Sequence, residues 1–159
     1  AGGLEIQKAL IDPNVLMESV YQAYLPIAAR QGVRLELFSD PTATLIDVDE
    51  GRMIQVLKNL VENALRYTPV GGDIKLTTHI TNNVELWVSD TGMGIEAEDL
   101  PHVFERFYQA DKARSASKGK MGLGLAICKA LVLAQGCQIS AHSGGKEQGS
   151  TFVISIGRS

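Results

Sequence analysis

Two carboxamides spaced four residues apart are the clearest chemical feature of this sequence. Asn59 and Asn63 lie in a segment whose apolar residues recur about every 3.6 positions, which predicts an amphipathic helix. Residues four apart share a helix face, and Arg66 and Tyr67 extend that face by one turn. A face with two amides, a cation and a phenol suits a polar ligand, although a polar pair alone more often marks a solvated face.

A carboxylate follows a predicted strand further along the chain. Residues 84–89 alternate apolar and polar side chains and run directly into Asp90. An ionised carboxylate only accepts hydrogen bonds, so Asp90 could select a ligand that carries an amine. Gly92 and Gly94 have no Cβ, which would let the backbone approach that ligand closely. Asp-x-Gly is also common turn chemistry, so this segment alone leaves a simple turn as an alternative.

Two more segments complete the set. Gly122 and Gly124 open an apolar helical segment, and the free backbone amides and dipole of a helix start favour phosphate. A glycine-rich loop without a ligand would have the same composition. Residues 149–152 stand at the head of a terminal strand. Separate turns do not explain why four such segments occur in this order.

These segments resemble the catalytic ATP-binding domain of two-component sensor histidine kinases, part of a superfamily that includes gyrase, mismatch-repair ATPases and a chaperone class. Residues 59–69 match the asparagine box and residues 90–95 the first glycine box. Residues 104–108 match the phenylalanine box and residues 122–127 the second glycine box. The resemblance covers nearly the whole chain and implies ATP and Mg²⁺ as cofactors.

The resemblance also assigns roles on the amide-bearing face. Asn63 would ligate Mg²⁺ through its amide oxygen, and Asn59 would hold a metal-bound water or a phosphate oxygen. Arg66 and Tyr67 would contact phosphate and sugar. Hydrolytic members of the superfamily usually carry Glu where this chain has Asn59, and an amide cannot act as a general base. The resemblance therefore implies that the site holds ATP for transfer and hydrolyses it only slowly.

At the adenine end of ATP, Asp90 would accept a hydrogen bond from the amine of adenine. Ser150 resembles the family's hydroxyl that supports this contact. The second glycine box departs from the common pattern, because Lys120 stands where Gly is usual; Lys120 is the candidate source of charge for the γ-phosphate. The residues expected to bind ATP are Asn59, Asn63, Arg66, Tyr67, Asp90, Gly92, Gly94, Ile95, Lys120, Gly122, Leu123, Gly124, Leu125 and Ser150. Catalytic roles are expected for Asn59, Asn63 and Arg66.

An acceptor histidine cannot be recognised in the sequence. The family's acceptor is followed by an acidic residue, whereas His79, His102 and His142 are followed by Ile, Val and Ser. We therefore expect the chain to be the ATP-binding half of a kinase. It would donate the γ-phosphoryl group to a histidine on a separate dimerisation domain of the same kinase, with a response regulator downstream.

Composition limits the other possibilities. The 159 residues suit one domain over 1–159, and a formal net charge of −3 gives no nucleic-acid footprint. The longest apolar run falls far short of the roughly 20 residues of a membrane span, so no direct membrane insertion is expected. Cys128 and Cys137 suit buried thiols in a reducing compartment. We expect a cytoplasmic location, either free or as the cytosolic part of a membrane-anchored sensor.

Periodicity and turn signals predict an α+β fold, a two-layer sandwich in which a mixed sheet of about five strands packs on three helices. The expected helices are 13–32, 49–67 and 123–135, and the expected strands are 4–10, 33–38, 44–47, 73–80, 83–89, 138–141 and 151–156. Residues 92–121 are expected to form a long mobile ATP lid. Phe104 and Phe107 would anchor a turn of the lid, either as its core or as a docking point for the acceptor helix.

The sequence also allows two other functions. One is a serine kinase of the anti-sigma type, which Asn59 disfavours because a Glu at that position would be expected. The other is a non-catalytic module that senses nucleotide and controls a partner. The altered second glycine box around Lys120 is the only feature that supports it.

Overall fold

The computed structural model describes residues 5–108 and 121–158. Its main sheet has the strand order β2-β4-β5-β7-β6. β2 runs parallel to β4, and the other neighbours are antiparallel, so the sheet is mixed as predicted. The strands are β2 (Arg34–Phe38), β4 (Asp73–Ile80), β5 (Asn83–Asp90), β6 (Gln138–His142) and β7 (Ser150–Gly157).

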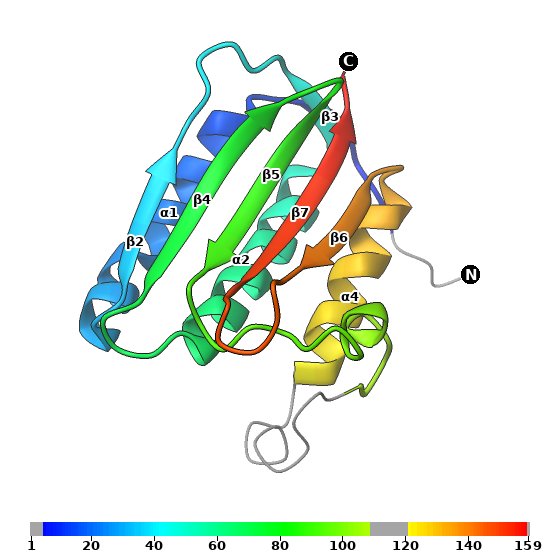
Figure 1. The fold of residues 1–159 in the computed structure, drawn as a ribbon. Helices are drawn as coiled ribbons and strands as arrows, with labels where there is room; N and C mark the ends of the chain where they lie inside the picture. Colours follow the sequence, from blue (N-terminus) through cyan, green and yellow to red (C-terminus); the bar gives the residue numbers. More distant parts are fainter. Residues whose placement is uncertain (1–4, 109–120, 159) are drawn as a thin grey trace.

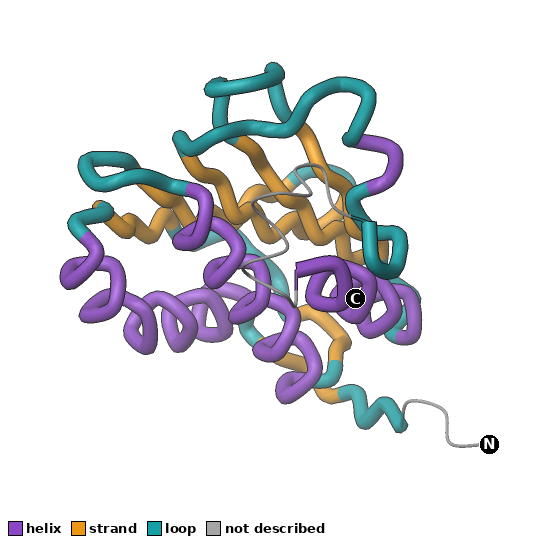
Figure 2. The backbone as a smooth tube through the Cα atoms, turned by 90° about the horizontal axis from the view of Figure 1, so that it is seen from below, coloured by secondary structure: helices purple, strands orange, loops and turns teal. Residues whose placement is uncertain are grey.

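Three α-helices in the described residues lie together against one face of this sheet (Figures 1 and 2). They are α1 (Pro13–Gln31), α2 (Glu50–Tyr67) and α4 (Met121–Ala134), and a short 3₁₀ turn, η1, covers Leu100–His102. The core between the two layers takes its apolar side chains from the inner faces of the strands and the three helices. The predicted two-layer α+β sandwich is confirmed. None of the described helices combines the length and the apolar character that a membrane crossing needs.

Local capping explains where the first two helices begin and end. Asp12 caps α1 by accepting from the backbone N–H of Asn14, and Gly32 ends it in the left-handed conformation at φ 72°. Asp49 caps α2 by accepting from the N–H of Arg52 at 3.1 Å. Every position of the predicted apolar stripe of α2 is buried, which fixes the rotation of this helix against the sheet: Met53, Val56, Leu57, Leu60 and Ala64.

The N-terminal strand differs from the prediction of residues 4–10. β1 covers only Ala9–Ile11 and pairs with β3 (Ile46–Val48) in a separate two-stranded sheet. The backbone N–H of Gln7 instead donates to the Asp49 side chain at 2.9 Å. Residues 5–8 therefore add no strand to the main sheet, and Gln7 among them binds Asp49, the residue that caps α2.

The fold brings four chain segments to one end of the molecule. The carboxyl ends of α2 and β5 lie at the lower end of Figure 1, with the start of β7 and the start of α4. These segments carry most of the residues to which the sequence assigns chemistry. Of the predicted lid, residues 109–120, including Lys120, lie outside the described residues.

Candidate functional site

Asp90 is the last residue of β5 and lies opposite Ser150, the first residue of β7. Its Oδ1 accepts from the backbone N–H of Gly92 at 2.8 Å and from that of Ser150 at 3.3 Å. Its Oδ2 accepts from the Ser150 hydroxyl at 2.8 Å. Burial raises the pKa of Asp90, and these hydrogen bonds oppose the shift. Since a carboxylate offers about four acceptor positions, Oδ2 keeps one for a ligand.

The first glycine box packs tightly against the protein itself. A Cβ on Gly92 would lie 2.3 Å from the carbonyl oxygen of Tyr67, and one on Gly94 would lie 2.0 Å from that of Gly145. Gly94 also has a φ of 73°, which side chains disfavour. The sequence predicted close approach of a ligand at these glycines; the structure shows close approach of neighbouring backbone. Their ligand contacts stay predictions.

Asn63 has a buried oxygen that lacks a partner. Its side chain lies on α2 and is only 8% exposed, and its Oδ1 has no hydrogen-bond partner among the described atoms. A buried, unpaired amide oxygen is unfavourable by about 1–3 kcal/mol, so such a group suits a site that a ligand completes. Oxygen is the donor that Mg²⁺ prefers, so this atom fits the predicted metal-binding role.

The other residues of this helix face occupy different environments. Asn59 is half-buried, and a hydrogen bond joins its side chain to Cys128 of α4. Burial raises the pKa of the Cys128 thiol to about 12, and the bond to Asn59 acts in the opposite direction. Arg66 is exposed in the last turn of α2, and the half-buried Tyr67 accepts from the N–H of Met93 through its carbonyl at 3.2 Å.

The second glycine box forms the beginning of α4, as predicted. Gly122, Leu123 and Gly124 lie within the first turn and Leu125 is buried in the core. Among the described residues, no atom outside the helix lies within 4 Å of the position that a Cβ on Gly124 would take. The described residues therefore leave space beside Gly124, as a phosphate contact there would require.

The two phenylalanines of the phenylalanine box differ in exposure, since Phe104 is half-buried and Phe107 is exposed. Phe104 packs edge-on against Phe152 of β7, with ring centroids 6.0 Å apart, and Lys129 lies over its ring at 5.7 Å. Phe107 is 67% exposed and has a φ of 64°, an uncommon value for a residue other than glycine. Phe104 thus packs against the edge of the core, whereas Phe107 belongs to the surface.

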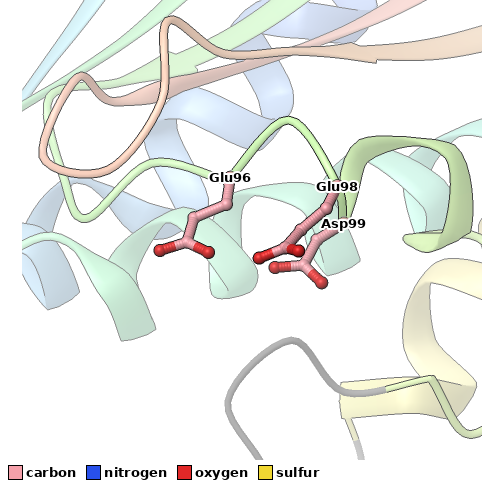
Figure 3. A group of neighbouring side chains, drawn as sticks. All are labelled: Glu96, Glu98 and Asp99. Atoms are coloured by element: carbon pink, nitrogen blue, oxygen red, sulfur yellow. The ribbon is translucent and has the colours of Figure 1, made fainter.

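Three carboxylates gather on the loop after Ile95 (Figure 3), a feature that the sequence analysis did not single out. Oxygens of Glu96, Glu98 and Asp99 lie within 4.8 Å of one another, and their side chains point to the same side of the loop. A hydrogen bond with Glu96 raises the pKa of Glu98, and Asp99 accepts from the Tyr108 hydroxyl. Exposed acidic groups commonly gather without an ion, so this cluster is not assigned as a metal site.

Ser143 is the residue in this region that the sequence analysis missed. It lies in the loop between β6 and β7, and its hydroxyl contacts backbone groups of Ile95, Gly145 and Gly149. A serine just after a strand is ordinary turn chemistry. Nothing in the local sequence indicates this contact, because Ser143 and Ile95 are 48 residues apart.

The histidines occupy the positions expected of residues outside the site. His79 is on β4 and packs against Trp87 with the two rings tilted by 46° and their centroids 4.3 Å apart. His142 ends β6 and contacts the Ser140 hydroxyl at 2.9 Å, and His102 is on η1. His79 and His142 therefore lie on strands and His102 on an exposed turn, and none of the three is among the residues predicted to bind ATP.

Comparison with known proteins identifies relatives of this chain. The family described as "Histidine kinase-, DNA gyrase B-, and HSP90-like ATPase" matches residues 48–158. The signal transduction histidine-protein kinase BaeS of Escherichia coli (strain K12) is 38% identical over 144 residues, which cover 89% of this chain and 31% of BaeS.

Solved structures give the same result. Full-length ShkA in complex with AMPPNP is similar with a TM-score of 0.83 and 30% identity, over 98% of this chain and 32% of ShkA. The nucleotide-free catalytic domain of histidine kinase ThkA has a TM-score of 0.80 and 25% identity, over 98% of this chain and 97% of that domain. The chain spans only 18–31% of the length of the first curated relatives.

Proposed function

The chain belongs to the family of histidine kinase-, DNA gyrase B- and HSP90-like ATPases, and from this premise we propose that it binds Mg-ATP and donates the γ-phosphoryl group to a histidine. Its similarity to the catalytic domain of a histidine kinase over nearly the full length supports the choice within the family. The acceptor histidine would belong to a separate dimerisation domain of the same kinase. A response regulator would act downstream, and the site would face the cytosol.

The unpaired oxygen of Asn63 is the observation that carries this proposal. It is a buried amide oxygen on the α2 face that also bears Asn59 and Arg66, and no described atom satisfies it. Asn63 would hold Mg²⁺ together with phosphate oxygens. When bound, the ion supplies charge that neutralises the triphosphate. A neutral ligand such as Asn leaves that charge undiminished.

The remaining residues would bind and orient the nucleotide. Asp90 would accept the adenine amine at the free position of Oδ2, with Ser150 holding the carboxylate in place. Backbone amides in the first turn of α4 would receive phosphate, and Arg66 would reach phosphate from the end of α2. Phosphoryl transfer depends mainly on positioning and electrostatic stabilisation, so the nucleophile can come from another domain. Asn59 cannot deprotonate water, which favours transfer over hydrolysis.

The test mixes this chain with a matched histidine-bearing domain and labelled ATP. We expect acid-labile phosphate on the partner domain with the parent chain and none with Asn63→Ala. Calorimetry should show that Asn63→Ala loses at least about tenfold of the Mg²⁺-dependent part of nucleotide affinity, the size typical for groups around a metal.

Gln55→Ala is the matched control, since Gln55 is an exposed amide on the same helix. It should transfer phosphate at the parent rate. Circular dichroism would show that both variants keep the fold. Parent-level transfer by Asn63→Ala would refute the assigned role, and absence of any ATP binding by the parent would refute the proposal as a whole.

A further inference from the structure

Every hydrogen-bonding position of the Ser143 hydroxyl is in use. The oxygen accepts from the backbone N–H of Ile95 at 2.9 Å and from that of Gly145 at 3.1 Å. The hydroxyl donates to the carbonyl of Gly149 at 2.6 Å, with the carbonyl of Gly145 more distant at 3.3 Å. A hydroxyl has one donor and two acceptor positions, so the residue is fully satisfied by backbone from two loops.

These two loops hold Asp90 from both sides. One begins at Asp90 and reaches Ile95, where Ser143 binds it. The other ends at Gly149, directly before Ser150, whose N–H and hydroxyl both donate to Asp90. Ser143 therefore links Ile95, at the end of the first loop, to Gly149. Gly149 directly precedes Ser150, which binds the Asp90 carboxylate.

Backbone contacts between the loops are close but few. Glu147 donates to the carbonyl of Met93 at 2.6 Å, and Gly149 donates to that of Gly92 at 3.1 Å. A Cβ on Gly149 would lie 2.1 Å from the carbonyl oxygen of Asp90, so the loops touch without an intervening side chain. The Ser143 side chain has hydrogen bonds to both loops at once. A shift at Ser143 would thus be transmitted to the Asp90 carboxylate.

We propose that Ser143 is a positioning residue that sets base selection, by holding the Asp90 carboxylate where it meets the amine of adenine. The proposal rests on the proposed function, because it requires that ATP binds at Asp90. It adds to that function a residue in the loop between β6 and β7, outside the matched boxes. Removing the hydroxyl would leave the N–H groups of Ile95 and Gly145 without a partner, and both loops would relax.

The experiment measures ATP and GTP affinity by calorimetry for Ser143→Ala and Ser143→Thr. We expect Ser143→Ala to lose about tenfold in ATP affinity and little in GTP affinity, since guanine carries an oxygen where adenine carries the amine. The ratio of the two affinities should fall about tenfold. Ser143→Thr keeps the hydroxyl and should restore the ratio to within about threefold of the parent.

Ser140→Ala is the matched control, because Ser140 lies on β6 and its hydroxyl contacts His142 rather than the loops. It should leave both affinities unchanged. A general loss of stability would lower ATP and GTP affinity together, so the ratio separates positioning from simple unfolding. A folded Ser143→Ala chain with the parent ratio would overturn the proposal.

Amide hydrogen exchange on the parent gives a second test that needs no variant. The Ile95 N–H should be protected without nucleotide, because it donates to Ser143. Rapid exchange at Ile95 would overturn the inference even if Ser143→Ala failed to fold. If Asp90→Asn lowers ATP affinity but Ser143→Ala does not, the inference alone fails; if the parent binds no ATP, the proposed function fails.

Discussion

Replacing Asp90 with Asn is the sharpest test of the base contact, because the structure fixes which atom of the new amide goes where. Oδ1 accepts from two backbone N–H groups, those of Gly92 and Ser150. An NH₂ group cannot accept a hydrogen bond, so the amide oxygen of Asn must take the Oδ1 position. The NH₂ group then takes the Oδ2 position, where the ligand amine is expected.

The expected loss follows from this geometry. The Ser150 hydroxyl can turn and accept from the new NH₂ group, so the link between β5 and β7 survives. An adenine amine would then face a donor in place of an acceptor. A buried donor left without a partner costs about 1–3 kcal/mol, which corresponds to a loss of roughly 5- to 150-fold in ATP affinity. GTP affinity should not fall, because guanine offers an oxygen at that position.

Calorimetry with ATP and GTP at neutral pH measures the effect, and thermal melting shows whether the fold is kept. Asp47→Asn serves as the control, since Asp47 is exposed on β3. The pH dependence of ATP affinity gives an independent test of the same contact. Burial raises the pKa of Asp90, so parent ATP affinity should fall in mild acid as the carboxyl gains a proton, more than in Asp90→Asn. Unchanged ATP affinity in a folded Asp90→Asn chain would refute this account.

Three further outcomes are expected. Phe107→Ala should keep the melting temperature and ATP affinity but transfer less phosphate to the histidine domain. Phe104→Ala should destabilise the fold by about 0.5–3 kcal/mol, because Phe104 is partly buried and packs against Phe152. Equal transfer by Phe107→Ala and the parent would exclude a docking role. Cys128 should react with a thiol reagent only on unfolding, because burial raises its pKa to about 12, and fast native labelling would contradict this. Backbone hydrogen bonds, first that of Gln7, lower the pKa of Asp49 below its ordinary 3.8, so its contribution to stability is present above that value and is lost as pH falls through the lowered pKa. The difference in melting temperature between the parent and Asp49→Asn should therefore become smaller in acid. A difference that stays constant with pH would refute this contribution of Asp49.

Local signals were enough to predict most of the fold. Asp12-Pro13 and Gly32 define α1 because caps and turn conformations depend on a few neighbouring residues. The pairing of β1 with β3 depends on contacts between segments more than 30 residues apart, which periodicity cannot supply. β1 has only three residues, and the backbone N–H of Gln7 before it donates to Asp49, a contact that nothing in the local sequence indicates.

For the site, too, the sequence located residues correctly, but long-range packing explains their environment. Spacing located Asn63, and burial explains why its oxygen lacks a partner, since a residue at the border of the apolar stripe is covered as α2 packs. For Gly92 and Gly94 the place was predicted but the reason was not. Backbone carbonyls of Tyr67 and Gly145 occupy the space that side chains would need. Gly92 and Gly94 are therefore required first because the two loops beside Asp90 pack closely against neighbouring backbone. The predicted ligand contact at Asp90 depends on that packing.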